Sequence, residues 1–484
     1  MTAQVALCCR AMIVAVAGLV SAVLVLFAHE YGYHRDELYF IAAGKRLDWA
    51  YVDQGPVTPL LARLMTELDA DSLTLLRLPS ALAAGLIVLI TGLLAGELGA
   101  KRSAQVLAAV IAGVSVVVLF NGHLLSTTTF DLLCWTAATW LIVRAVLRDE
   151  RLWLAVGLVV GLGLLNKPLP ALLAVAVLVS LLAAGPRHVL RSPYPWLGAM
   201  IAVVLFAPFI LWQAAHGWPH LEVSAAIARG ESASSEPWWA VVPFQLLLVS
   251  PVLAPVWIAG LVRLFRDAEL RFLAVTWVLL AVVFMATGGK PYYLAGMLPL
   301  LVAAGCVPIP RWLRGRPPLL RKAALGLALA ASIVIDPVIA LPVLPVRDID
   351  LVVAMNEDVG ETVGWPELVS TVAHAHQDGA VIFTRNYGEA GAIDRFGPAY
   401  GLPQAYSGHN AYWHWGPPPD LASRVVVVGI PAERASRFFV GCTTAATIGN
   451  DAGVDNEENG APVLFCAGPS RPWSQMWPEL RRMG

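Results

Sequence analysis

The sequence predicts an α-helical polytopic membrane protein with about eleven transmembrane helices and a small C-terminal α/β domain. Of its 484 residues, 58% are hydrophobic and only 14% are charged, and the mean hydropathy is +0.67. Soluble domains are about 45–50% apolar and about 25% charged. Long apolar runs recur as far as residue 341, and charged and turn-forming residues replace them beyond it. The chain is therefore divided into a membrane part and a polar tail.

The membrane part contains eleven apolar segments, and a spanning helix needs about 20 residues. They lie at 11–28, 73–95, 103–120, 129–147, 152–165, 169–184, 196–214, 239–262, 272–287, 292–309 and 323–341. Segments 152–165 and 169–184 are short and could be one interrupted helix. A single straight helix over both would run roughly 50 Å, whereas the hydrocarbon core is about 30 Å thick. Two spans are therefore predicted.

Basic residues predict the orientation, because short cytoplasmic loops carry an excess of Lys and Arg. Such residues fall in alternate loops, at 101–102, 148–151, 187–191, 263–271 and 311–322. These loops and the N-terminus are predicted to be cytoplasmic. The loops at 30–72, 121–128, 166–168, 216–238 and 288–291, and the C-terminal domain, are then extracytoplasmic in a multi-pass protein of the cell membrane. The first segment also fits a cleaved signal peptide, which is the alternative to an anchor.

The predicted domains are residues 1–341, with a first external loop at 30–72, and residues 342–484. Within that loop, a helix is expected at 36–47, and a second, interfacial helix is expected to begin with Thr58 as N-cap and Pro59 at N1. In the tail, branched apolar runs predict strands at 380–384, 424–430 and 462–466, and helices are expected at 365–377 and 387–396. Cys442 and Cys466 are predicted to form an extracytoplasmic disulfide, and two separate thiols are the alternative.

Two classes of function are not supported by the sequence. The formal net charge of −1 argues against a nucleic-acid partner, which would favour a basic face. Phosphate-binding loops, dinucleotide-binding glycine patterns, nucleophile elbows and zinc-protease motifs are missing from the sequence, so soluble nucleotide chemistry has no basis.

Three polar motifs stand where apolar segments end, at 33–39, 166–167 and 288–293, and all fall on the predicted outer side. Asp36 and Glu37 begin a helix, where a carboxylate can accept a proton from an attacking hydroxyl. The alternative is an acidic pair that stabilises the helix N-terminus through the dipole. Lys167 and Lys290 stand at span boundaries, where a lysine costs about 2.5–3.5 kcal/mol. A lipid phosphate would offset that cost, and snorkelling to the headgroup layer is the alternative.

Asp131 begins the fourth span, after His123 and a run of threonines. It is a candidate to orient an acceptor, to hold a cation or to pair with Arg35, and a helix cap is the alternative. His216, His220 and Glu222 match no strong zinc pattern, so no metal site is predicted there.

These motifs together resemble the GT-C superfamily of membrane glycosyltransferases, most closely the protein O-mannosyltransferase-like family 39 and the aminoarabinose lipid A transferases. The resemblance rests on the acidic motif at 36–39 and on the segments 51–59, 161–168 and 290–299. It departs at Gln54-Gly55, where some relatives carry a lysine before the proline, and at Asn166, which replaces a threonine.

The resemblance implies a role for each candidate residue. Asp36 would be the general base, with Glu37 supporting it or binding the acceptor. The donor phosphate would contact Lys290, Lys167, Tyr292 and Tyr293, with Arg35 as a further contact. Asp131 would take the second acidic position, and Tyr39 and His123 belong with it to the expected acceptor region.

The function expected from these residues is inverting transfer of a sugar from a polyprenyl-monophosphate donor to a hydroxyl on the outer face of the membrane. The partners would be the lipid-linked sugar, a glycan, lipid or protein acceptor, and the bilayer. No cofactor is certain, and a divalent cation stays open. The alternative function is a transporter or flippase of a lipid-linked sugar, whose ionisable groups would lie near the bilayer midplane.

Overall fold

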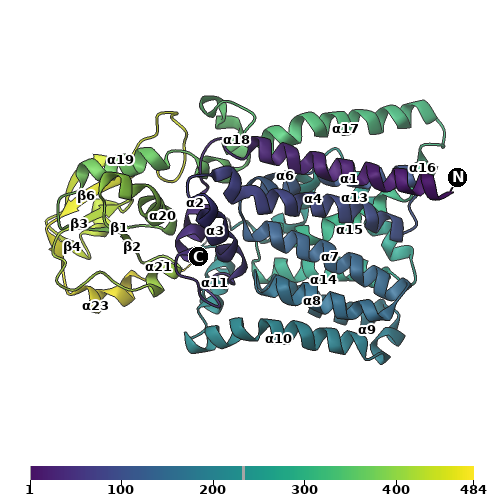
Figure 1. Ribbon diagram of the computed structural model, residues 1–484, viewed down its shortest axis with the longest axis horizontal. Coiled ribbons are helices and arrows are strands. Elements are labelled where there is room, and N and C mark those ends of the chain that lie inside the picture. The colour runs from purple at the N-terminus through teal and green to yellow at the C-terminus, as the bar shows by residue number, and fades with distance from the viewer. Residues whose placement is uncertain (1, 232–234, 484) are drawn as a thin grey trace.

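The computed structural model describes residues 2–231 and 235–483, with side chains from residue 9 onward. Figure 1 shows a bundle of helices that run side by side, with the C-terminal sheet region docked at one end of the bundle. The short helices α2 and α3 lie between the two parts. The predicted fold class, a helical membrane protein with a small C-terminal α/β region, is confirmed.

The helical bundle is built from α1 and α4–α17. Their bounds are α1 Thr2–Phe27, α4 Leu73–Glu97, α5 Arg102–Val114, α6 Val116–His123, α7 Thr127–Leu147, α8 Trp153–Leu164, α9 Leu169–Ala184, α10 Tyr194–Ala215, α11 Pro219–Ala228, α12 Val241–Val249, α13 Ala254–Arg266, α14 Arg271–Thr287, α15 Leu298–Cys306, α16 Ile309–Trp312 and α17 Pro318–Ala340. A 3₁₀ segment at Pro291–Met297 leads into α15. Each of the eleven predicted apolar segments is therefore largely helical.

The predicted number of eleven spans is not confirmed. Among the described residues, six helices are long and apolar enough to cross a membrane, or eight if two bent pairs each count as one span. The pairs are α5–α6, bent by 55° at Ser115, and α12–α13, bent by 116°. The hydroxyl of Ser115 bonds back to the Ala112 carbonyl at 2.7 Å, an interaction that bends helices. Helices α9 and α14 are shorter apolar helices.

The first loop folds into two helices, α2 Arg35–Gly44 and α3 Val57–Leu68. A capping box fixes the start of α2, because His34 Nδ1 accepts from the Asp36 amide and the Glu37 carboxylate accepts from the His34 amide. Thr58 is not the N-cap of α3. Pro56 holds that position, and the Thr58 hydroxyl instead donates to Asn166 Oδ1 at 2.7 Å. This bond ties the loop to the end of α8.

The C-terminal region folds around a five-stranded sheet in the order β2-β1-β3-β6-β5. Strand β1 pairs in parallel with β2 and β3, whereas β6 runs antiparallel to β3 and β5. The strands are β1 Val381–Thr384, β2 Ala405–Ser407, β3 Val425–Val428, β5 Thr443–Thr447 and β6 Pro462–Cys466, and β4 Phe439–Val440 pairs with β7 Gly468–Pro469. The helices are α18 Asp350–Met355, α19 Trp365–Ala375, α20 Tyr387–Phe396, α21 Ala411–His414, α22 Ala432–Ala435 and α23 Trp473–Met476. The four valines of β3 are fully buried, which places the core of this region at the central strand.

The structure joins Cys442 and Cys466 in a disulfide that closes a loop of sequence separation 24. Closing a loop of this length stabilises a fold by about 3 kcal/mol in the chain-entropy account. We expect intact-mass spectrometry of the non-reduced protein to show this pair linked, while the buried Cys134 and Cys306 react as single thiols after unfolding. Alkylation of both Cys442 and Cys466 without reductant would contradict this expectation.

Candidate active site

A cavity of about 1920 Å³ lies where the bundle meets the C-terminal region, and both parts line it. The three polar motifs meet there, because Asp36, Lys167 and Lys290 all line its wall. Arg35, Tyr39, Tyr292 and Tyr293 line it as well. Residues that are more than a hundred positions apart in sequence thus share one chamber.

Asp36 lies in the first turn of α2, and its Oδ1 accepts a hydrogen bond from the Tyr387 hydroxyl at 2.8 Å. Burial works to raise the pKa of this carboxyl. Neighbouring groups outweigh burial and hold the pKa below its ordinary value; they are His34, Arg35, Tyr387 and Lys290. Asp36 is therefore an ionised carboxylate at neutral pH, the form that a general base requires.

Lys167 and Lys290 reach the cavity from two breaks between helices, after α8 and after α14. The ammonium of Lys167 lies 5.4 Å from the ring centroid of Tyr292 and 4.9 Å from that of Tyr293. Burial lowers the pKa of Lys167, although the Asp131 carboxylate works in the opposite direction. Burial and the nearby Lys167 lower the pKa of Lys290 to about 8. Two like charges held together in a partly dry site favour an anionic ligand between them.

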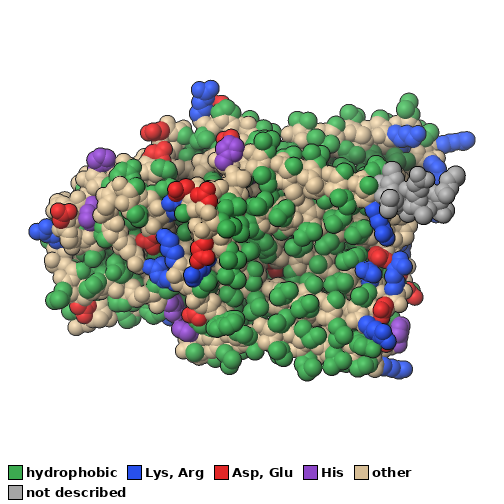
Figure 2. Space-filling model, viewed as in Figure 1, with side chains coloured by type: hydrophobic (Ala, Val, Ile, Leu, Met, Phe, Trp, Pro, Cys, Tyr) green, Lys and Arg blue, Asp and Glu red, His purple; other side chains and the backbone are tan. Residues whose placement is uncertain are grey.

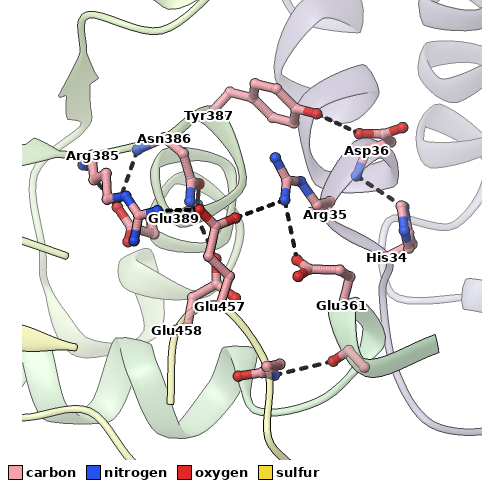
Figure 3. Close-up of polar contacts among 12 residues, drawn as sticks. His34, Arg35, Asp36, Glu361, Arg385, Asn386, Tyr387, Glu389, Glu457 and Glu458 are labelled. Carbon is pink, nitrogen blue, oxygen red and sulfur yellow. Dashed lines mark hydrogen bonds and ion pairs between the residues drawn. The ribbon is translucent and has the colours of Figure 1, made fainter. Parts of the chain in front are cut away.

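Arg35 is already engaged by two carboxylates of the C-terminal region (Figure 3). Its Nη1 lies 2.9 Å from Glu457 and 3.5 Å from Glu361. Glu457 in turn pairs with Arg385. Arg35, a predicted contact of the donor phosphate, thus also links α2 to the C-terminal region.

Glu37 is placed away from the cavity, in a buried structural network. Its carboxylate is fully buried and accepts from Arg77 at 2.8 and 2.9 Å and from the Leu125 amide at 2.8 Å. His123 joins the same network, with Nε2 3.1 Å from Arg77 Nη1. Neither residue lines the cavity wall. The geometry gives both of them a supporting position behind Asp36 instead of contact with an acceptor.

Asp131 also lies outside the cavity wall, and its carboxylate acts on Lys167 through its charge. It is buried in α7, and its Oδ1 accepts from Trp135 Nε1 at 3.1 Å. The N-cap of α7 is Ser126, which accepts from the Thr128 amide at 3.1 Å. Asp131 is therefore neither the cap of this helix nor a partner of Arg35, and it reaches the site through its charge on Lys167.

Asp53 and Asn410, neither of which was a candidate site residue in the sequence, complete the polar wall. The Tyr39 hydroxyl donates to Asp53 Oδ1 at 3.0 Å, and Asn410 Nδ2 donates to Asp53 Oδ2 at 3.3 Å. Burial raises the pKa of Asp53 to about 6, in contrast to the lowered pKa of Asp36. Asp53 stands inside the segment 51–59 that carries the family resemblance, which was the available signal for it. Asn410 belongs to the distant tail, in a stretch for which the sequence suggested no firm role.

One group of carboxylates in the described part of the chain has the spacing of a cation site. Oxygen atoms of Glu361, Glu457 and Glu458 lie within 4.8 Å of one another. Burial and then Glu458 raise the pKa of Glu361 to about 7. The guanidinium groups of Arg35 and Arg385 form ion pairs with carboxylates of this group. His220 and Glu222 make other contacts, since His220 Nδ1 lies 3.2 Å from the Val52 carbonyl and Glu222 pairs with Arg481.

Apolar side chains from four helices of the bundle line another part of the cavity. They are Val116, Val117 and Phe120 of α6, Leu169 and Leu172 of α9, Phe244, Leu247 and Leu248 of α12, and Ala331, Ile335 and Ile339 of α17. One cavity thus offers a charged wall and a hydrocarbon-like wall. Such a combination suits an amphiphile with an anionic head.

Comparison with known proteins identifies a matching sequence family and solved structures with a similar architecture. The sequence profile of a family described as dolichyl-phosphate-mannose-protein mannosyltransferase matches residues 53–212. None of the curated proteins matches the chain. ArnT from Cupriavidus metallidurans, bound to undecaprenyl phosphate, superposes with a TM-score of 0.59 at 14% identity, covering 97% of this chain and 99% of ArnT. An oligosaccharyltransferase from Archaeoglobus fulgidus, tethered to an acceptor peptide, matches with a TM-score of 0.53 at 12% identity, covering 82% of this chain and 64% of its own. The chain shares the overall fold of these membrane proteins.

Proposed function

We propose that this protein, which has the fold of the GT-C membrane glycosyltransferases, transfers a sugar from a polyprenyl-monophosphate donor to a hydroxyl acceptor, with inversion. One observation carries the proposal. The carboxylate of Asp36 and the ammonium groups of Lys167 and Lys290 line a single cavity that apolar side chains of four bundle helices also line. ArnT, a structural neighbour whose match covers 97% of this chain, has been seen with undecaprenyl phosphate. That observation supports a lipid-phosphate donor.

The proposed reaction is a single displacement. Asp36 accepts the proton of the acceptor hydroxyl while the hydroxyl oxygen attacks the anomeric carbon. The bond from that carbon to the phosphate oxygen breaks, and the phosphate leaves with the bonding electron pair. Lys167 and Lys290 stabilise the negative charge that develops on the phosphate. Attack opposite the leaving group inverts the anomeric centre.

We further propose that the cavity and the C-terminal domain face the outside of the cell membrane. Figure 2 shows Lys and Arg side chains gathered at the end of the bundle opposite to the C-terminal region, beyond a broad apolar surface. Contacts link basic loops at that end, since Arg148 pairs with Glu97 at the end of α4 and Arg263 donates to the Leu98 carbonyl. The excess of basic residues favours a cytoplasmic location for that end. On this orientation, residues 1–341 form the membrane domain and residues 342–484 form its external cap.

Binding of the donor phosphate can be tested with undecaprenyl phosphate itself. We expect Lys167→Met and Lys290→Met each to weaken its binding about 10- to 100-fold, because each removes one charge-assisted contact of about 1.5–3 kcal/mol. Lys322→Met is the matched control, an exposed lysine in the second turn of α17. Titration of the purified protein in nanodiscs measures the affinities. Equal affinity in all four proteins would remove both lysines from the phosphate site.

The same titration has an expected pH dependence. The pKa of Lys290 is lowered to about 8, so its positive charge is present below pH 8 and is lost as the pH rises through that value. Affinity for undecaprenyl phosphate is therefore expected to fall above about pH 8. In Lys290→Arg, which stays protonated throughout this range, the fall should disappear. A parental pH profile in Lys290→Arg would show that another group controls binding.

Catalysis is tested in membranes that contain the protein, whose own lipids, glycans and proteins serve as acceptors. The probes are undecaprenyl phosphates that carry radiolabelled mannose, glucose or arabinose. New glycosidic bonds that depend on the protein support the proposal. Movement of the labelled lipids across vesicles without any such bond would contradict it and favour the transporter alternative.

A further inference from the structure

We infer that Tyr387, in the C-terminal region, is a positioning residue for Asp36, so that the tail supplies part of the active site. The inference rests on the proposed role of Asp36 as the base. The Tyr387 hydroxyl donates to Asp36 Oδ1 at 2.8 Å, and Tyr387 lines the same cavity. In Figure 3 its ring extends from α20 toward the first turn of α2. A carboxylate held at one oxygen keeps a fixed orientation toward an incoming hydroxyl.

A capping box at the start of α20 holds the backbone of Tyr387 in place. Tyr387 is the first residue of α20, and the N-cap Asn386 accepts from the Glu389 amide at 2.9 Å. The Glu389 carboxylate accepts from the Asn386 amide at 3.2 Å and from the Arg385 amide at 2.8 Å. These reciprocal bonds hold the first turn in one conformation.

Two glycines bring this turn close to Asp36. A Cβ atom added to Gly388 would lie 3.0 Å from Arg35 Cβ, and one added to Gly391 would lie 2.9 Å from Leu38 Cβ. Both positions face α2, because residues three apart share one face of a helix. Helix α20 can therefore approach α2 at backbone distance, and the Tyr387 hydroxyl reaches Asp36.

The ring of Tyr387 is held on three sides. Its centroid lies 4.7 Å from that of Tyr39 and 4.8 Å from that of His409. The Arg35 guanidinium lies 5.1 Å from the centroid of the Tyr387 ring. Arg35 is itself fixed by its ion pairs with Glu361 and Glu457. Because the ring has neighbours on each of these sides, the hydroxyl stays directed at Asp36.

The hydroxyl also contributes to the electrostatics of the base. A hydrogen bond to the charged form of an acid lowers its pKa, and Tyr387 acts in this direction on Asp36. Charged or titratable groups face Asp36 from every neighbouring element. They are the N-cap His34 and Arg35 of α2, Tyr387 of α20, Lys290 before the 3₁₀ segment and Tyr292 within it, Lys167 after α8, and Asp53 in the first loop. Loss of the hydroxyl alone removes one lowering influence and leaves the charges in place.

The test compares Tyr387→Phe with Tyr412→Phe in the membrane transfer assay, using whichever of the three undecaprenyl-phosphate sugars the parent transfers. Tyr412 is the matched control, since its hydroxyl donates to the Asp394 carboxylate at 3.0 Å and lies outside the cavity wall. For Tyr387→Phe we expect kcat to fall about 10- to 100-fold, with KM for the donor changed less than about threefold. The acid limb of the kcat profile should move to higher pH, because the pKa of Asp36 rises. Tyr412→Phe should keep the parental kcat and profile.

The outcomes separate this inference from the proposed function. Transfer by the parent but not by Asp36→Asn, together with parental kcat and acid limb in Tyr387→Phe, would overturn the positioning role alone. Absence of transfer by the parent with all three probes would overturn the proposed function and this inference with it. Thermal unfolding is measured in parallel, and a fall in kcat with an unmoved acid limb and a lowered unfolding temperature would also count against the positioning role.

Discussion

Replacement of Asp36 by Asn is expected to lower the rate of sugar transfer by about 10²- to 10⁴-fold, the range of a general base. Asparagine has the shape of aspartate but cannot accept the proton of the attacking hydroxyl. It also keeps an oxygen that can accept from Tyr387, so the local packing should persist. Binding of undecaprenyl phosphate should change less than about tenfold, because the lysines are untouched. The measurements are single-turnover transfer and lipid titration on the same preparation.

Asp69→Asn is the control for this substitution, since Asp69 is exposed at the end of α3 and lies outside the cavity wall. It should transfer sugar at the parental rate. Transfer by Asp36→Asn at the parental rate, with equal protein in the membrane, would remove Asp36 from the role of base. The proposed displacement would then need another proton acceptor.

Replacement of Glu37 by Gln is expected to produce the largest loss of stability. Glu37 is 0% exposed and Arg77 is 1% exposed, and two hydrogen bonds join their side chains. Removing one charge of such a pair leaves the other uncompensated and typically costs about 3–5 kcal/mol. The amides of His34 and Leu125 would lose a charged acceptor in the same step. Thermal unfolding in detergent, followed by tryptophan fluorescence, should show a clearly lower transition temperature.

A matched pair on the surface provides the control. Arg63 and Glu67 form an i,i+4 ion pair on α3 with both side chains about half exposed, and exposed pairs of this kind contribute about 0.3–0.5 kcal/mol. Glu67→Gln should therefore shift the transition only slightly. The double variant Glu37→Gln/Arg77→Met should lose less than the sum of the single variants. Equal shifts for Glu37→Gln and Glu67→Gln would show that the buried pair adds no stability.

The position of the site was predictable from the sequence because it depends on where spans end. Lys167 and Lys290 stand at breaks between apolar helices, and a count of alternating spans brings them to the level of Asp36. The structure places all three on one cavity wall. The internal bends were not predictable in the same way, because Ser115 interrupts a run that is continuously apolar.

The supporting network behind Asp36 was hidden from sequence reasoning for a physical reason. Arg77 lies four residues into an apolar span, and nothing near it in sequence indicates that its partner is Glu37, 40 positions earlier. A buried charge implies a partner but does not name it. The pattern therefore marked Glu37 as a second acid of the site, whereas the structure uses it to hold the first turn of α2.

The contribution of the tail depends on how one part of the chain docks on another. Three of its strands and its two longer helices follow from local patterns, since observed β1, β3, β6, α19 and α20 lie within the predicted ranges, whereas β2, β4, β5 and β7 were not predicted. The contacts from Tyr387 to Asp36 and from Asn410 to Asp53 arise only after docking. The capping-box residues and the glycines of α20 are visible in the sequence. They indicate where the helix begins, but they do not identify the helix against which it packs.

The bond between Asp36 and Tyr387 joins residues 351 positions apart. During synthesis the first loop leaves the ribosome long before the tail does. A nascent chain with all its membrane helices inserted would still hold its carboxylate without this partner. The full rate of transfer would then be reached only after the tail has folded against α2, so a polypeptide terminated before Tyr387 would consume the lipid-linked sugar slowly.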